Sequence, residues 1–205
     1  YQISVTSTRG LPAASRRPRN ERSLYPREHG ASMELLFPLL SAFALGAPTL
    51  AGIALAISAL PHSKGYPITI VVQDVDDDPE QQVLGACADA MLFGITSLTG
   101  RMIDEGLKMA AKVRERFPDL PIIWGGTHPT IAPEQTIEHP LVDIVVVGQG
   151  ETTFMELVEA IENGAPLETV PGILFKRDGE IVKTPCRGVT DIDTLPPPPF
   201  EILDM

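Results

Sequence analysis

The chain carries the stretch Pro121-Ile122-Ile123-Trp124-Gly125-Gly126-Thr127-His128-Pro129-Thr130 beyond its midpoint. The first four residues are apolar and predict a short buried strand that runs directly into two glycines and a polar loop. Adjacent glycines at the carboxyl end of a strand leave bare backbone, against which a bulky ligand can lie. Ligands of open α/β sheets bind in the crevice at the carboxyl ends of the strands. The stretch therefore predicts a strand of a parallel sheet that ends at a binding site.

A second apolar strand lies upstream and ends in hydroxyl side chains: Phe93-Gly94-Ile95-Thr96-Ser97-Leu98-Thr99. Between Leu98 and Gly125 lie 26 residues, enough for one crossover helix and the return strand. The segment after Thr99 has apolar residues at helical spacing, acidic residues early and basic residues late, and Pro118 ends it. These features predict a helix between two parallel strands.

The same alternation runs through most of the chain. Further strands are predicted at residues 34–40, 68–72 and 143–147, with helices at residues 47–60, after Asp78-Pro79, and from Glu151 to a stop at Gly164. This pattern predicts the α/β class, with a doubly wound, five-stranded parallel sheet in the order 2-1-3-4-5, as in flavodoxin-like or Rossmann-like folds. After Gly172 the apolar period changes to two around Asp178-Gly179, which predicts a C-terminal β-hairpin.

We expect four segments along the chain. A disordered basic extension at residues 1–32 precedes an α/β binding domain at 33–165, a β-hairpin extension at 166–190 and a proline-rich linker at 191–205. The net charge of the chain is −11, whereas residues 1–32 hold six arginines against two acids. The acidic balance of the remainder argues against a nucleic-acid surface. Cys87 and Cys186 lie far apart and form no metal motif, as expected of a cytoplasmic protein.

Residues 35–60 carry no charge and are long enough to span a membrane. The alternative is a buried strand, a loop and a helix packed on the sheet. We favour this globular interpretation, because Pro38, Gly46, Pro48 and Gly52 interrupt the run where two separate elements need breaks. Asp76-Asp77-Asp78 is read as a solvated helix start rather than a cation site.

The motifs together resemble a known family over about residues 33–205. The hydroxyl-x-Leu segment Thr96-Ser97-Leu98, followed at this distance by Gly125-Gly126, resembles the B12-binding domain of corrinoid proteins. Gly-Gly-x-His-Pro-Thr and then Asp143-Ile-Val-Val-Val-Gly-Gln-Gly-Glu151 are similar to the amino-terminal cobalamin domain of B12-dependent radical SAM enzymes. This resemblance implies cobalamin as the cofactor. In the full-length protein it also implies a [4Fe-4S] cluster, S-adenosylmethionine and a radical SAM domain in the same chain.

The resemblance also implies a site built from three loops. Hydroxyl groups would hydrogen-bond the nucleotide tail, a glycine pair would form the floor of its slot, two residues would line the mouth, and a third loop would offer backbone N–H groups. The implied cofactor-binding residues are the hydroxyl segment Thr96, Ser97, Leu98 and Thr99, the glycine pair Gly125 and Gly126, the mouth residues Thr127 and His128, and the third-loop residues Gly148, Gly150 and Glu151. Each has a simpler interpretation too: helix capping for the hydroxyls, a tight turn for the glycines, an ordinary surface group for His128.

The sequence departs from the family pattern at two places. Gln149 stands where the family usually has an acid. Corrinoid proteins that place a histidine on cobalt carry Asp-x-His-x-x-Gly after the first strand, whereas here His62-Ser63-Lys64-Gly65 follows the first helix and Leu60 replaces the aspartate. Only 30 residues separate Gly65 from Thr96, too few for the family's spacing between its histidine motif and its hydroxyl segment. We therefore expect cobalamin to bind base-off, with no histidine on the metal, and we assign no metal ligand.

The leading hypothesis is the cobalamin-binding module of a B12-dependent radical SAM enzyme that performs methyl transfer or related radical chemistry. The sequence contains no Cys-x-x-x-Cys-x-x-Cys motif, so we expect no catalysis from this chain alone, and the linker would lead to a radical SAM domain. A stand-alone corrinoid sensor, a nucleotide- or sugar-nucleotide-binding domain and a membrane-anchored protein are the alternatives. If Gly126 forms the slot, Gly126→Leu is expected to abolish corrinoid binding and leave the domain folded.

Overall fold

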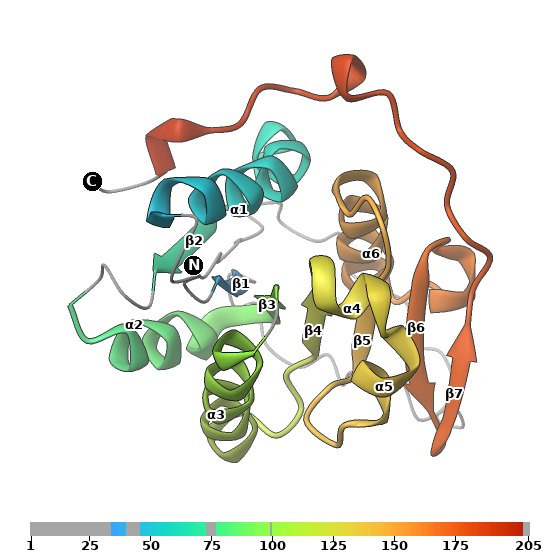
Figure 1. Cartoon of the computed structure of the whole chain (residues 1–205), viewed down its shortest axis with the longest axis horizontal. Coiled ribbons are helices and arrows are strands. Elements are labelled where there is room, and N and C mark those ends of the chain that lie inside the picture. Colours follow the sequence, from blue (N-terminus) through green and yellow to red (C-terminus); the bar gives the residue numbers. More distant parts are fainter. Residues whose placement is uncertain (1–33, 40–45, 73–76, 99, 203–205) are drawn as a thin grey trace, which may run out of the picture.

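The computed structural model describes residues 34–39, 46–72, 77–98 and 100–202, and the side chains from Gly52 onward except Val72. The predicted basic extension and Thr99 lie outside the described residues. One sheet organises the described part of the chain (Figure 1). Its strands are β1 (Glu34–Leu39), β2 (Ile68–Val72), β3 (Ala90–Thr96), β4 (Ile122–Gly125), β5 (Ile144–Val146), β6 (Ile173–Arg177) and β7 (Glu180–Lys183).

The sheet order is β2-β1-β3-β4-β5-β6-β7. Strands β1 to β5 are parallel and follow the predicted order 2-1-3-4-5. The predicted C-terminal hairpin is present as β6 and β7. The prediction of a parallel sheet was wrong for the sheet as a whole, because β6 pairs antiparallel with β5. Ile173, Leu174 and Phe175 are buried, and pairing β6 with β5 satisfies the backbone groups that β5 would otherwise expose at a sheet edge. The sheet is therefore mixed, with seven strands.

Helices cover both faces of the sheet, as the doubly wound prediction requires. Figure 1 shows α1 and α6 on one face and α2, α3 and α5 on the other. The bounds are α1 (Gly46–Ser63), α2 (Pro79–Ala86), α3 (Arg101–Arg116), α4 (Thr127–Ile131), α5 (Pro133–Glu138) and α6 (Glu151–Asn163). Each face has its own apolar core: Phe154 and Leu157 of α6 pack with Ile123 on one side, and Ala110 and Val113 of α3 pack near Trp124 on the other.

Local sequence signals set most helix ends. The Asp78 side chain accepts a hydrogen bond from the N–H of Gln81 at 3.2 Å, and Pro79 begins α2, as predicted. Gly164 adopts the left-handed conformation that ends α6. The polar loop predicted after Gly126 is instead two short helices, α4 and α5. Helix α5 begins at Pro133, whose fixed φ suits a first helical turn.

The uncharged run at residues 35–60 forms β1 and most of α1. In the described part of the chain, no helix has both the length and the apolar character needed to cross a membrane. Ala54, Leu55, Ser58 and Ala59 of α1 are buried, and the helix packs beside α6. Ala54, Leu55 and Ala59 therefore contribute to the core of the domain.

The segment after β7 returns across the layer formed by α6 and α1 (Figure 1, red trace). Arg187 donates to the hydroxyl of Thr153 in α6 at 2.7 Å, and its guanidinium pairs with Glu156. A 3₁₀ turn at Phe200–Ile202 then lies next to β2. We call residues 185–202 the C-terminal strap. The predicted linker, residues 191–205, thus meets the domain near its described end, where Phe200–Ile202 lies next to β2.

Candidate functional site

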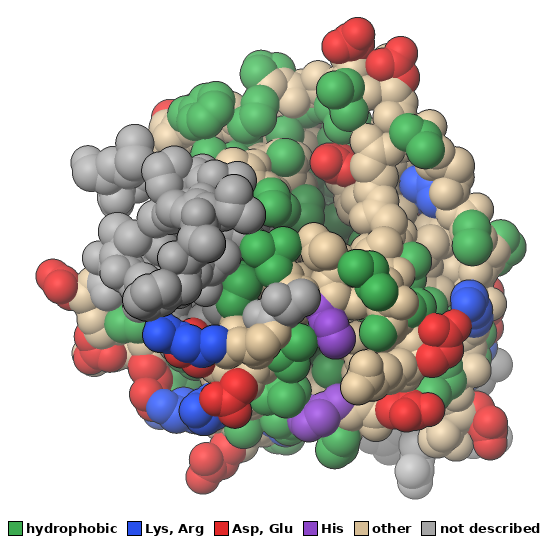
Figure 2. Space-filling view, viewed as in Figure 1, with side chains coloured by type: hydrophobic (Ala, Val, Ile, Leu, Met, Phe, Trp, Pro, Cys, Tyr) green, Lys and Arg blue, Asp and Glu red, His purple; other side chains and the backbone are tan. Residues whose placement is uncertain are grey.

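A cleft of about 430 Å³ opens between α1 and α6 at the carboxyl end of β4. This is the edge at which the sequence predicts a ligand. Figure 2 shows this face hollowed between the two helices, with hydrophobic side chains inside the hollow. The lining residues are Ile53, Ala56, Ile57, Ile123, Gly125, Gly126, Thr127, Thr130, Ile131, Val146, Gly148, Gln149, Gly150, Glu151 and Phe154. Seven of these fifteen residues have apolar side chains and four are glycines, which is typical of sites for largely apolar ligands.

Gly125, the last residue of β4, and Gly126, which follows it, play different parts. Gly126 has φ +96° and ψ −162°, a region that only glycine readily adopts. A Cβ on Gly126 would lie 2.6 Å from Oγ1 of Thr96 and 2.9 Å from the carbonyl oxygen of Ser97. Gly126 therefore lets the turn pass close to the end of β3. The expectation that Gly126→Leu leaves the domain folded was wrong, because the new side chain would be driven into β3 rather than into the cleft.

Thr130 connects the glycine turn to the loop after β5. Its hydroxyl donates to the carbonyl oxygen of Gly126 at 2.8 Å and accepts from the N–H of Gly148 at 3.0 Å. Gly148 has φ +81°, so it too needs a conformation that favours glycine. The two loops on this side of the cleft are thus held together by one hydroxyl. The sequence analysis included Thr130 in Gly-Gly-x-His-Pro-Thr but gave it no role, because the motif does not show which loop its hydroxyl meets.

The predicted hydroxyl residues meet the glycine turn at the end of β3. Thr96 is paired with Gly125 in the sheet, and Ser97 accepts from the N–H of His128 through its carbonyl oxygen at 3.2 Å. Both side chains are buried, and the Ser97 hydroxyl has no hydrogen-bond partner among the described residues. Leu98 packs partly buried against the core beneath α1 and α6. The third predicted hydroxyl, that of Thr99, lies outside the described residues.

The predicted mouth residues separate. Thr127 lines the cleft, whereas His128 is half-buried and is not among the lining residues. Ile131 of α4 lines the cleft with 75% of its surface exposed. An exposed large apolar side chain at the mouth of an apolar cleft is typical of a ligand-contacting position.

The loop after β5 brings Gly148, Gln149, Gly150 and Glu151 to the rim of the cleft. Glu151 is the first residue of α6, where the helix dipole favours a carboxylate. Its buried Oε2 makes no hydrogen bond to the described residues. Gln149 accepts a hydrogen bond from the N–H of Thr190 in the C-terminal strap at 2.8 Å. Position 149, where the resembling family usually has an acid, therefore ties the strap to the rim of the cleft.

His62 lies apart from the cleft. It belongs to the last turn of α1, which leads into the amino end of β2, and its Nδ1 is 3.9 Å from Oε1 of Glu201. The cleft lies at the carboxyl end of β4. Among the described residues, no group of three or more His, Cys, Asp or Glu side chains is arranged to hold a metal ion.

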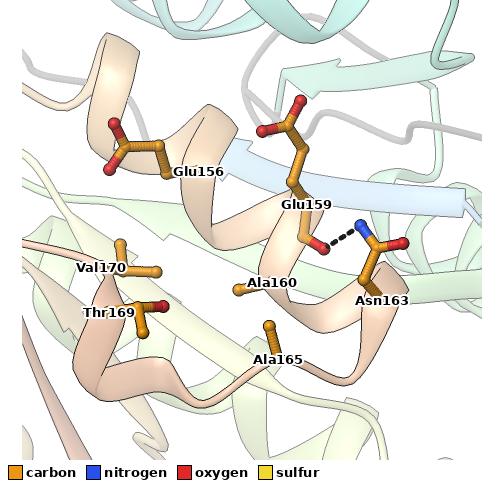
Figure 3. Close-up of a pocket in the computed structure, with 7 residues that line it drawn as sticks. All are labelled: Glu156, Glu159, Ala160, Asn163, Ala165, Thr169 and Val170. Atoms are coloured by element: carbon orange, nitrogen blue, oxygen red, sulfur yellow. Dashed lines mark hydrogen bonds between the residues drawn. The ribbon is translucent and has the colours of Figure 1, made fainter.

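A second, shallower hollow of about 270 Å³ lies at the carboxyl half of α6 (Figure 3). Figure 3 shows the carboxylates of Glu156 and Glu159 pointing away from it, and these groups pair with Arg187 and Lys64. The amide of Asn163 donates to the carbonyl oxygen of Glu159 at 2.7 Å. The polar groups around this hollow thus have partners within the protein, and the cleft is the better candidate site.

The residues of the cleft fit part of a corrinoid. An apolar wall and bare backbone at Gly125 suit a flat aromatic base. The Ser97 hydroxyl, unpaired among the described residues, is buried beside the Gly126 turn and is not among the residues that line the cleft. The amide side chains of a corrin ring would find few polar partners along this apolar wall, which suits the nucleotide tail better. The α1 residues Ile53, Ala56 and Ile57 were missed by the sequence analysis, because an apolar helix face gives no sign of whether it meets protein or ligand.

Comparison with known proteins agrees with this geometry. The B12 binding domain family model matches residues 49–158, which are 110 of the 205 residues. The matched region begins in α1 and ends in α6, the two helices that flank the cleft. It also contains β4 and the loops that line the site.

Two curated relatives and one solved structure are similar to the chain. Anaerobic magnesium-protoporphyrin IX monomethyl ester cyclase of Synechocystis is 30% identical over 63% of this chain and 27% of that protein. Cobalamin-dependent radical SAM methyltransferase TokK of Streptomyces tokunonensis is 37% identical over 38% of this chain and 12% of that protein. The chain spans about a quarter of the length of the curated relatives that it matches over the most residues.

The solved structure is that of the radical S-adenosylmethionine methyltransferase TsrM from Kitasatospora setae with cobalamin and a [4Fe-4S] cluster bound. It superposes with a TM-score of 0.62 over 77% of this chain and 30% of that chain, at 20% identity. At this identity the likeness shows the fold. Together with the family match over more than half of its residues, it leads to one conclusion: the chain belongs to the B12-binding domain family.

Proposed function

We propose that this chain binds cobalamin and inserts the nucleotide tail of the cofactor into the cleft between α1 and α6. The observation that carries the proposal is the apolar cleft at the carboxyl end of β4, with glycine backbone on its floor. Burial of a flat apolar base against Ile53, Ile57 and Phe154 would provide most of the binding free energy. The corrin ring would then lie outside the cleft, over the carboxyl ends of the strands.

The residues of the cleft would bind and orient the cofactor. The Ser97 hydroxyl has no partner in the described part of the chain, but it is buried and does not line the cleft, so a contact with the sugar-phosphate tail would require the Gly126 turn to move. Thr130 holds the two glycine loops in place. When bound, cobalamin supplies a cobalt centre that can carry a methyl group or take part in a radical step. For the whole protein we propose such a step together with a radical SAM domain.

We further propose that cobalamin binds base-off and without a histidine on cobalt. His62 lies at the end of α1 beside the amino end of β2, and His128 does not line the cleft. A metal–imidazole bond of about 2 Å requires the ring to lie directly beneath the metal. His62 therefore lies away from a corrin placed over the carboxyl ends of the strands. His128 follows β4 at this edge, and for it we propose a place beside the ligand rather than on the metal.

The visible spectrum of protein mixed with hydroxocobalamin tests both proposals. We expect saturable binding with base-off absorption. We also expect the cobalt(II) form to show no threefold nitrogen superhyperfine splitting in electron paramagnetic resonance, in the wild type or in His62→Ala and His128→Ala. No binding at all would refute the cobalamin assignment. Binding with a splitting that disappears in either variant would refute only the ligand assignment.

A stand-alone corrinoid sensor is a second candidate, and the C-terminal strap favours it in one respect. The strap is tied to the rim of the cleft through Gln149 and Thr190, so it is placed to respond to a ligand. Sequencing the gene beyond codon 205 would separate the two: a downstream Cys-x-x-x-Cys-x-x-Cys segment supports the enzyme, and a signalling or DNA-binding domain supports the sensor.

A further inference from the structure

Two glycines line the cleft although the backbone does not require glycine at either position. Gly125 has no positive φ, and Gly150, the residue that precedes α6, has φ −91° and ψ −20°, an ordinary right-handed helical conformation. A Cβ on Gly125 would lie 3.8 Å from Cβ of Val146. A Cβ on Gly150 would lie 3.6 Å from both Cδ1 of Ile57 and Cγ1 of Val146. These are normal van der Waals distances, so an alanine fits the free protein at both positions.

Gly126 and Gly148 differ from this pair, because both adopt positive φ and Gly126 also passes close to Ser97. Their glycine identity is explained by the backbone of the turn. The backbone does not explain why residue 150 is a glycine. A Cβ at this position would face inward between α1 and β5, where a methyl group would form new apolar contacts. The free protein would gain packing from the methyl group. A ligand in the cleft would lose the same space.

We infer that Gly150 is a specificity-determining residue, and that its missing side chain keeps open the corner of the cleft that receives the nucleotide base of the corrinoid. The inference rests on the proposed function, since it concerns the same cleft. The corner between Ile57 and Val146 offers only aliphatic groups, which suits an aromatic base. The amide side chains of the corrin ring would lose their hydrogen bonds with water there, at a cost in free energy.

Cobalamin and cobinamide, which has the corrin ring but no nucleotide base, distinguish this role from a general effect on binding. We expect Gly150→Ala to fold with a melting temperature equal to or above that of the wild type. Its affinity for hydroxocobalamin should fall about tenfold or more, as expected when one methyl group overfills a packed contact. Its affinity for cobinamide should equal that of the wild type, because no base competes for the corner.

Two further variants make the test sharper. Ala56→Leu adds bulk to the cleft from α1 instead of α6 and should also weaken cobalamin binding without weakening cobinamide binding. Gly85→Ala is the matched control: it replaces a helical glycine of α2, on the other face of the sheet, where an added Cβ meets nothing within 4 Å. It should leave both affinities unchanged.

The outcomes separate the inference from the function on which it rests. Wild-type protein that binds no cobalamin would refute the proposed function. Wild-type binding that Gly150→Ala leaves unchanged would refute the role of Gly150 alone. Equal weakening of cobalamin and cobinamide would show that the corner meets the corrin ring rather than the base, and would also overturn the inference, as would an unfolded Gly150→Ala protein.

Discussion

The hydroxyl of Thr130 accepts a hydrogen bond from the backbone N–H of Gly148 at 3.0 Å, and it also donates to the carbonyl oxygen of Gly126 at 2.8 Å. One side chain from the short helix α4 thereby joins the loops that follow β4 and β5. Both loops line the cleft. The shape of the candidate site therefore depends on a residue to which the sequence analysis assigned no role.

Replacement of Thr130 by valine removes the hydroxyl and keeps the shape of the side chain. We expect the free energy of unfolding to fall by about 1 kcal/mol, the net value of a typical hydrogen bond, and cobalamin affinity to fall more than this loss alone explains. Urea denaturation and titration with hydroxocobalamin measure the two effects. Thr130→Ser keeps the hydroxyl and is the control; if it behaves like Thr130→Val, the hydrogen bonds are not the cause.

Replacement by alanine should change the free energy of unfolding differently at Gly125, which ends β4, and at Gly126, which follows it. Gly126→Ala places a Cβ in a glycine-only backbone region and against Ser97, so we expect a loss of about 1–3 kcal/mol in the free energy of unfolding. Gly125→Ala meets only Val146 at 3.8 Å and should change stability little. Urea denaturation of the two variants would show this contrast, and equal stabilities would contradict the assignment of roles.

The C-terminal strap should loosen when Gln149 loses its acceptor oxygen. In Gln149→Ala the N–H of Thr190 has no side-chain acceptor. We expect this amide to exchange with deuterium roughly fivefold to tenfold faster, the factor that corresponds to one hydrogen bond of about 1 kcal/mol. Gln149→Glu retains an acceptor and should exchange at the wild-type rate. Hydrogen exchange followed by mass spectrometry on peptides that contain Thr190 makes the comparison.

Stability should fall as the solution becomes mildly acidic, partly because of His139. Burial lowers the pKa of His139 below its ordinary value of 6.5, and the Lys176 ammonium lowers this pKa further. The neutral ring is also needed as an acceptor, because Nδ1 receives the N–H of Leu141 at 3.2 Å. The unfolded chain therefore binds the proton first, and stability is lost as pH falls through about 6.5 toward the lower pKa of the folded state.

The contribution of His139 can be isolated by comparing the wild type with His139→Asn, which has an acceptor oxygen and does not titrate. We expect the free energy of unfolding of the wild type to decrease more between pH 7.5 and pH 5.5 than that of the variant. Urea denaturation of both proteins at both pH values provides the four free energies of unfolding. An equal decrease in the two proteins would assign the acid sensitivity to other groups.

Local signals in the sequence determined most of the secondary structure. The apolar run Ile122-Ile123-Trp124, the Asp78-Pro79 helix start and the Asp178-Gly179 turn each act within a few residues, and the structure places β4, α2 and the β6–β7 hairpin accordingly. The alternation of strands and helices also fixed the parallel order 2-1-3-4-5, because right-handed crossovers leave few other arrangements. The edge at which a ligand would bind followed from the same rule.

Tertiary structure decided which residues form the site and why. The sequence places Gly125 and Gly126 in one loop and Gly148 and Gly150 in another, but only the positions of Ser97, Val146 and Ile57 in space show which glycine of each pair serves the backbone and which leaves room. The pairing of β6 with β5, the α1 wall of the cleft and the Thr190–Gln149 contact join residues far apart in the chain. Such contacts depend on how elements pack rather than on local conformational preference, so local sequence signals did not reveal them.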